Sequence, residues 1–135
     1  MKAAWADSNV ILRHMSGEPA DLAARAHAVM EQVEAGQLRL HISTEVICEL
    51  VYVLGGKTYR YTPREMAHGL TALLTTPGVE PVEPELCLAA LDRMAELNVP
   101  FVDALIAARA LSAGEPVATF DERDFPRLGA DLLPT

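Results

Sequence analysis

Short apolar runs alternate with longer stretches of helical period along this chain. The short runs predict strands at Lys2–Ala6, Gln37–Ile42, Val79–Val82, Val117–Phe120 and Asp131–Leu133. The longer stretches, bounded by capping residues and glycines, predict helices at Asp21–Glu34, from the Ser43-Thr44 cap to about Leu54, from Thr62 to about Leu74, and at Pro84–Glu96 and Val102–Leu111. Helices between short, evenly apolar strands indicate parallel pairing with helices on both faces. We therefore expect a three-layer α/β/α sandwich.

Four carboxylates interrupt apolar segments of this pattern. They are Asp7, Glu49, Asp103 and Asp121. Burying an anion is costly and converging carboxylates repel one another, so such a set requires protons or a cation, of which a divalent metal ion is the usual one. Asp7 and Asp121 directly follow predicted strands, and ligands of parallel sheets bind beyond the carboxyl ends of strands, so we expect these two acids to lie together. The pattern thus predicts a metal-dependent active site.

Composition narrows the class of protein. The chain has 135 residues, half of them hydrophobic, which suits one folded domain over residues 1–135. We expect a cytoplasmic protein, because no apolar run reaches the ~20 residues of a membrane span. Cys48 and Cys87 lie among apolar residues, which favours reduced core thiols. The net charge of −8 argues against broad adhesion to nucleic acid but allows a local basic groove.

The order and spacing of these segments resemble PIN-domain nucleases, especially the small VapC-type toxins of toxin–antitoxin pairs. Four marks in the right order carry the resemblance, which covers nearly the whole chain. They are Asp7-Ser8-Asn9-Val10, Ser43-Thr44 followed by Glu49, Val102-Asp103-Ala104-Leu105-Ile106-Ala107-Ala108, and Thr119-Phe120-Asp121 with Asp124-Phe125 close behind. The resemblance implies four or five parallel strands, a pocket that binds Mg²⁺ or Mn²⁺, and endoribonuclease activity with 5′-phosphate and 3′-hydroxyl products.

The resemblance also implies roles for the acids. Asp7 and Asp103 would bind the metal. Glu49 would act on metal-bound water, or would interact with the residues that bind the metal without binding it directly. The family pattern separates its last two aspartates by one residue, whereas two residues separate Asp121 from Asp124 here. We favour Asp121 as the fourth site acid and Asp124 as an accessory ligand or a cap. Two residues would support the site, Asn9 through its amide and Thr119 through its hydroxyl.

Each acid also has an ordinary structural interpretation. Asp7 could cap the following helix, and Asp103 could be a favourable charge in a first helical turn. Glu49 could be a partly exposed helix position. The four together favour the functional interpretation. The four histidines lack metal-ligand spacing, and oxygen ligands suit Mg²⁺ or Mn²⁺ better than zinc.

The segment from Lys57 to Arg64 is the candidate surface for RNA. Lys57, Arg60 and Arg64 could contact phosphates, while Tyr59 could stack on an unpaired base. An ordinary solvated connection between helices is an equally good interpretation.

The resemblance further implies a homodimer and an antitoxin partner that covers the active site. The alternatives are an RNA-processing nuclease that is no toxin and a PIN-like binding module without activity. A phosphatase or phosphoacceptor with a Rossmann-like sheet ranks lower, since Asp7-Ser8-Asn9 lacks a second aspartate two residues on.

Overall fold

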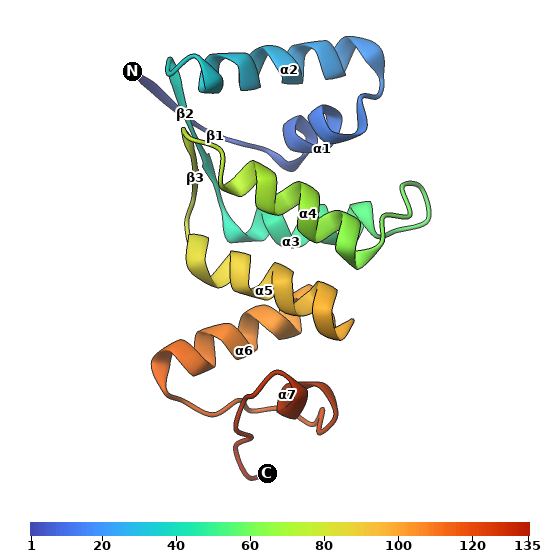
Figure 1. Ribbon diagram of the computed structural model, residues 1–135, viewed down its shortest axis with the longest axis vertical. Coiled ribbons are helices and arrows are strands. Elements are labelled where there is room, and N and C mark those ends of the chain that lie inside the picture. The colour runs from blue at the N-terminus through green and yellow to red at the C-terminus, as the bar shows by residue number, and fades with distance from the viewer.

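Three parallel strands form the sheet of this protein. The computed structural model describes all of residues 1–135, and its strands are β1 (Lys2–Trp5), β2 (Leu38–Ile42) and β3 (Val79–Pro81), in the spatial order β1-β2-β3 (Figure 1). β1 pairs with β2, and β2 pairs with β3, both in parallel. The predicted α/β class and parallel pairing are confirmed.

Seven helices surround or extend from this sheet. They are α1 (Ser8–Ser16), α2 (Ala20–Glu34), α3 (Thr44–Leu54), α4 (Pro63–Leu74), α5 (Pro84–Leu97), α6 (Phe101–Ala113) and α7 (Asp124–Arg127). The sequence predicts α2 to α6 within a few residues at each end. The start of α4 shows why: the Thr62 side chain accepts the backbone N–H of Glu65, and the Glu65 carboxylate accepts the backbone N–H of Thr62.

The middle strand β2 is buried on one face only, and all four residues of β1 are exposed. Leu38, Leu40 and Ile42 of β2 point into the core, whereas Arg39 and His41 alternate with them on the opposite face and are not buried. On that open face the Trp5 ring stacks on His41 with 4.7 Å between ring centroids. Because one face of β1 and β2 lacks a covering helix, the expected three-layer arrangement is incomplete.

The predicted fourth and fifth strands are wrong. Val117–Phe120 and Asp131–Leu133 meet each other at one parallel bridge, between Val117 and Leu132, and neither joins the sheet. Figure 1 shows this C-terminal segment beyond α6, at the opposite end of the molecule from α2. Apolar periodicity predicts that a segment is extended, but the pairing of distant segments depends on tertiary packing. The sheet therefore has three strands instead of four or five.

One hydrophobic core connects the sheet to the C-terminal segment. It contains 28 buried residues, including Ile42 of β2, Leu91 of α5 and Leu105 of α6, and it extends to Val117 and Phe125. Cys87 is buried, Cys48 is half-buried, and both thiols are free. None of the helices combines the length and apolarity that a bilayer crossing needs.

Candidate active site

Three of the predicted site acids lie together. Asp103 is in the first turn of α6, Asp121 is in the turn before α7, and Asp124 is the first residue of α7. A carboxylate oxygen of each lies within 4.8 Å of one from each of the others, and all three side chains are partly buried. The contact between α6 and α7 thus brings Asp103 together with two acids that lie 18 and 21 positions later in the sequence.

The electrostatics of this acid group differ from one member to the next. Burial raises the pKa of Asp103, and the neighbouring charges of Asp121 and Asp124 raise it further. The pKa of Asp121 is lowered instead, because the backbone N–H groups of Asp124 and Arg123 donate to its carboxylate. Asp103 is therefore the member that holds a proton most readily, and a cation bound here would relieve the repulsion that acts on it.

The group is only partly neutralised by the protein. The Asp121 Oδ1 atom accepts the N–H groups of Arg123 and Asp124, at 2.9 and 3.0 Å, and so holds the start of α7. Arg127 Nη1 donates to Asp124 Oδ1 at 3.1 Å. Arg123 Nε lies 3.9 Å from the same Asp124 oxygen. Three carboxylates thus share two arginines, and each has at least one oxygen without a hydrogen bond from the protein. This set of oxygen donors fits a hard divalent cation such as Mg²⁺ or Mn²⁺.

Asp7 and Glu49 do not belong to this acid group. Both are exposed, Asp7 at the carboxyl end of β1 and Glu49 on α3. Asp7 occupies the N-cap position of α1, but its carboxylate makes no capping hydrogen bond. The inference that these two acids are desolvated is therefore wrong. The cap interpretation of Asp7 gains no support either, and the roles of both residues remain predictions.

The two predicted supporting residues lie at different places. The Thr119 hydroxyl accepts the backbone N–H of Asp121 at 3.0 Å, so it positions the acid through the main chain rather than through its carboxylate. Asn9 is exposed on the first turn of α1, two residues after Asp7. Thr119 therefore shapes the turn that carries Asp121, whereas Asn9 belongs to the N-terminal side of the protein.

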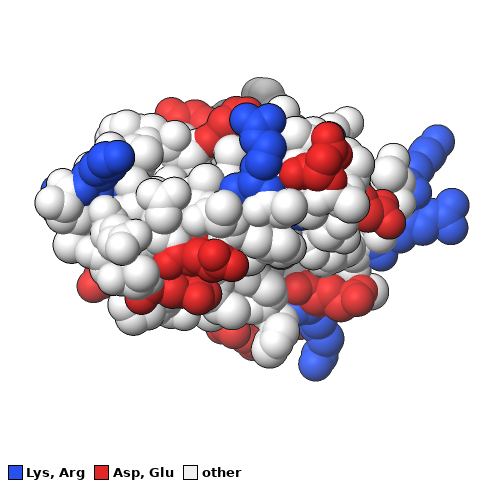
Figure 2. Space-filling view, turned by 90° about the horizontal axis from the view of Figure 1, so that it is seen from above, with Lys and Arg blue, Asp and Glu red and all other residues white.

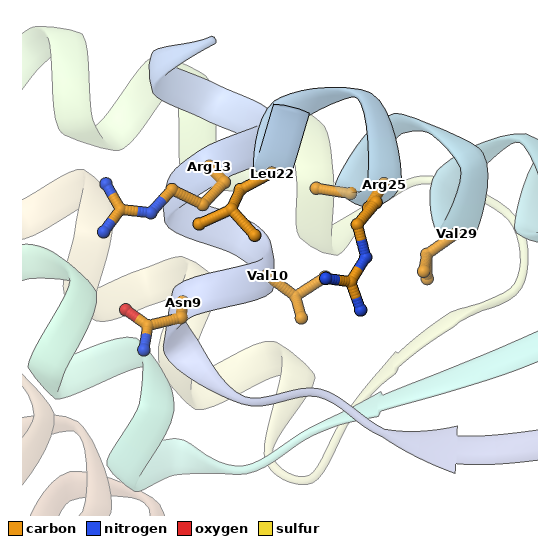
Figure 3. Close-up of a pocket in the computed structure, with 7 residues that line it drawn as sticks. Asn9, Val10, Arg13, Leu22, Arg25 and Val29 are labelled. Carbon is orange, nitrogen blue, oxygen red and sulfur yellow. The ribbon is translucent and has the colours of Figure 1, made fainter. Parts of the chain in front are cut away.

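A pocket of about 380 Å³ adjoins Asn9 between α1 and α2. Figure 3 shows Asn9 and Arg13, one helical turn apart on α1, together with Arg25 on α2. Val10, Leu22 and Val29 contribute apolar walls. The Arg13 Nε atom is buried without a hydrogen-bond partner. The guanidinium groups of Arg13 and Arg25 lie apart in Figure 3, and Arg13 Nη1 already donates to the Glu18 carbonyl oxygen and to the Tyr59 hydroxyl. No local signal in the sequence pointed to Arg25, because its place in the pocket depends on the packing of α1 against α2.

The predicted RNA-binding segment, Lys57 to Arg64, connects α3 to α4 and includes the first two residues of α4. Its cations Lys57, Arg60 and Arg64 are exposed, as the prediction requires. Tyr59, however, packs partly against the core, and its hydroxyl lies 3.4 Å from Arg13 Nη1. This contact places the segment beside the α1–α2 pocket and leaves the Tyr59 ring poorly placed for stacking on a base.

An exposed aromatic ring does occur near Glu49. Tyr52 lies three residues further along α3, which places it on the same side of the helix, and it is 83% exposed. Tyr52 was not predicted as a stacking residue, although its spacing from Glu49 is visible in the sequence. Arg109 is not free to contact a substrate, because its guanidinium group donates two hydrogen bonds to the Glu83 carboxylate.

Comparison with known protein families identifies the family to which this chain belongs. The PIN domain family matches residues 5–131. No curated protein and no solved structure matches the chain. The matched range contains all of the predicted site acids, Asp7, Glu49, Asp103, Asp121 and Asp124. Since the match spans nearly the whole chain, this protein belongs to the PIN domain family.

Proposed function

We propose that this protein is a Mg²⁺- or Mn²⁺-dependent endoribonuclease and the toxin of a type II toxin–antitoxin system, acting in the cytoplasm. PIN domains are generally nucleases that use divalent metal ions, which supports hydrolysis of nucleic acid. The observation that carries the proposal is the convergence of Asp103, Asp121 and Asp124 within 4.8 Å. That group supplies the oxygen ligands such a reaction needs.

The acid group has distinct tasks in this proposal. Asp103, Asp121 and Asp124 would hold the ion, which when bound would lower the pKa of water, shield the phosphate charge and stabilise charge on the leaving oxygen. Asp121 is fixed by two backbone N–H groups and Thr119, so its carboxylate is already oriented before substrate arrives. As the water oxygen bonds to phosphorus, its proton would pass to the solvent; the bond from phosphorus to the 3′ oxygen would break, and that oxygen would take up a proton from the solvent.

RNA must reach an acidic protein through local cations. Figure 2 shows Lys and Arg side chains as separate groups among acidic ones, with no continuous basic surface on that face. Arg13 and Arg25 of the α1–α2 pocket, joined through Tyr59 to the Lys57–Arg64 segment, would contact the backbone. Single-stranded RNA is favoured, because the exposed Tyr52 ring can stack on an unpaired base.

The toxin role rests on the resemblance to VapC-type proteins. It implies a cognate antitoxin and a homodimer. Expression of the protein alone should arrest growth, and Asp103→Asn should abolish the arrest. Normal growth with active protein present would favour an RNA-processing nuclease, and a gene for a small partner beside this one would favour the toxin.

A second candidate is a PIN-like binding module without activity. The separation of Asp7 and Glu49 from the acid group favours it, because one copy of the chain does not assemble all four predicted acids. Such a module would bind RNA or protein without cleaving it.

Cleavage of structured and single-stranded RNAs by pure protein tests the proposal. Activity should require Mg²⁺ or Mn²⁺, disappear with chelator, and be lost in Asp103→Asn. Glu122→Gln is the matched control, since Glu122 is exposed in the same turn as Asp121 and loses the same charge. Neither cleavage nor calorimetric metal binding would favour the inactive module.

A further inference from the structure

Two histidines meet at the contact between α1 and α2. His14 lies in the last turn of α1 and His27 in the middle of α2, and the two helices pack side by side (Figure 1). The Nδ1 atoms of the two rings are 2.7 Å apart, and the rings meet edge to face with 4.8 Å between their centroids. Two ring nitrogens at this distance share a hydrogen, because one ring must donate an N–H to the lone pair of the other.

Two acidic side chains of α2 adjoin this histidine pair. Glu31 lies one turn after His27 along the exposed side of the helix. Glu34 and His14 line a cavity of about 380 Å³ between α1, α2 and α4, and the other residues that line this cavity are uncharged. The Arg13 guanidinium is turned elsewhere, because it donates to the α1–α2 and α3–α4 connections. His27 and Glu34 are therefore the charged groups that act on the His14 ring.

The hydrogen bond between the two rings depends on how many protons they hold. A neutral pair forms it from one N–H group and one lone pair, and a pair with one additional proton forms a charge-assisted and stronger bond. A pair with two additional protons has N–H groups at both positions, so the bond is lost and two cations repel one another at short range. No cysteine or carboxylate lies close enough to complete a three-ligand metal site with the two nitrogens, so a proton is what they share.

His14 is the acceptor in this hydrogen bond. Burial lowers the pKa of His14, the charge of His27 lowers it further, and the charge of Glu34 offsets part of the effect. The half-buried His14 ring therefore stays neutral as the pH begins to fall, and the exposed His27 ring donates its Nδ1–H. Because folding lowers the His14 pKa, the bond stabilises the fold above the ordinary histidine value of 6.5, and this stabilisation is lost as the pH falls below it.

We propose that His14 and His27 form a pH-sensitive contact, which joins α1 to α2 while one ring is neutral and releases α1 from α2 when both rings are protonated. The α1–α2 pocket is built by the same two helices, with Arg13 on one and Arg25 on the other. Loss of the contact should therefore loosen this pocket and make the spacing of its two cations less fixed. The release itself requires no catalysis, and only its effect on RNA rests on the proposed nuclease function.

Nitrogen NMR of the histidine rings tests the protonation states directly. At about pH 7.5 the chemical shifts should show a His14 ring without a proton on Nδ1 and a His27 ring with a proton on Nδ1. As the pH falls, His14 should take up its second proton with a midpoint below 6.5. Spectra of His14→Asn and His27→Asn assign the signals. Two rings that both lack a proton on Nδ1 at about pH 7.5, or a His14 midpoint at or above 6.5, would overturn the proposal.

Amide hydrogen exchange tests the release of α1 from α2. Between about pH 7.5 and pH 5.5, corrected for intrinsic exchange rates, wild-type α1 and α2 should lose about fivefold or more of their protection relative to β2. His14→Asn should keep its protection, because the Asn oxygen replaces Nδ1 as the acceptor for His27 but does not take up a proton. The matched control is His68→Asn, which removes an exposed histidine of α4 and should behave as the wild type.

Further outcomes separate the contact from a general effect of acid. His27→Asn keeps a donor but removes one of the two charges, so its loss of protection should be smaller than that of the wild type. Equal losses in the wild type and His14→Asn, or a wild-type loss as large in β2 as in α1 and α2, would overturn the proposal. Release of α1 with unchanged binding of single-stranded RNA in chelator would retain the contact and reject the α1–α2 pocket as an RNA surface, without bearing on the acid group.

Discussion

The two aspartates that follow predicted strands have opposite surroundings. Asp121 is partly buried, accepts two backbone N–H groups and lies beside Asp103 and Asp124. Asp7 is exposed, makes no capping hydrogen bond and lies outside that group. The C-terminal region thus contains a formed acid group, whereas the N-terminal edge contains an unpartnered acid beside an unpaired strand. Similar local sequence does not produce a similar environment when the two regions differ in what packs against them.

Loss of the acid group should have the largest effect. Asp121→Asn should reduce metal-dependent RNA cleavage by about 10²-fold or more, since it weakens ion binding where the transition-state charge develops. The measurement is single-turnover cleavage at saturating Mg²⁺ or Mn²⁺. Glu122→Gln should cleave normally, and equal losses in both variants would show that general charge, not the acid group, matters.

Replacing Phe125 and Phe120 with alanine should change the free energy of unfolding by different amounts, because one ring is buried and the other is exposed. Phe125 is 4% exposed and Phe120 is 92% exposed. Phe125→Ala should lower the free energy of unfolding by about 3 kcal/mol through loss of buried contacts, and Phe120→Ala by less than about 0.5 kcal/mol. Urea denaturation of both variants gives the difference. A large loss in Phe120→Ala at dimer-forming concentrations would show that this ring is covered in solution.

The Glu83–Arg109 pair should contribute less and depend on pH. Arg109 and Thr44 donate to the Glu83 carboxylate and lower its pKa to about 2, which ties α3, α6 and the start of α5 together. Because folding lowers this pKa, the stabilisation is present above about pH 4.5 and is lost as the pH falls toward 2. Arg109→Ala should cost roughly 0.5–1 kcal/mol at pH 7, after allowance for solvent screening.

The pH dependence is checked by measuring the free energy of unfolding of Arg109→Ala and of the wild type between pH 2 and pH 7. The difference between them should shrink steadily below about pH 4.5. A difference that stays constant to pH 2 would mean that Arg109 acts through packing of its side chain instead of its charge.

Ionisation of Asp103 should affect stability in the opposite direction from ionisation of Glu83. Folding raises its pKa, so the ionised carboxylate opposes folding at neutral pH, and that penalty fades as acid protonates it. Asp103→Asn should therefore raise the melting temperature by a few degrees at pH 7 in chelator. The gain should diminish toward pH 4, and Mg²⁺ should stabilise the wild type but not the variant. A lower melting temperature in chelator would show that repulsion in the group is already compensated.

Local signals account for most of what the sequence predicted correctly. The cap at Thr62, the glycine stop after Ala113 and the apolar runs of β1 to β3 are each encoded within a few residues, so the corresponding elements were found. The proximity of Asp103 to Asp121 was predicted only from the family resemblance, which implied that the acids share one pocket. The short helix α7 was missed, because its four residues carry too little periodicity.

Long-range pairing accounts for the rest. Val117–Phe120 is as apolar as β1, yet nothing in either segment encodes which edge it joins. The same gap explains Asp7: its placement beside Asp121 depended on a strand pairing that this structure does not contain. Burial of Glu49 was also misjudged, since an acid among apolar neighbours on a helix can face outward at the 3.6-residue period.

Replacing Asp7 and Asp121 in turn with alanine compares the two regions most directly, and the Asp7 variant should show the smallest change in stability. Asp7→Ala should change the free energy of unfolding by less than about 0.5 kcal/mol, because no hydrogen bond is lost. Asp121→Ala should lower the melting temperature measurably, because the start of α7 loses its acceptor. If Asp7→Ala nevertheless abolishes cleavage while leaving the melting curve unchanged, its carboxylate acts in chemistry and not in folding. Unchanged cleavage in Asp7→Ala would confine the active site to the C-terminal acid group.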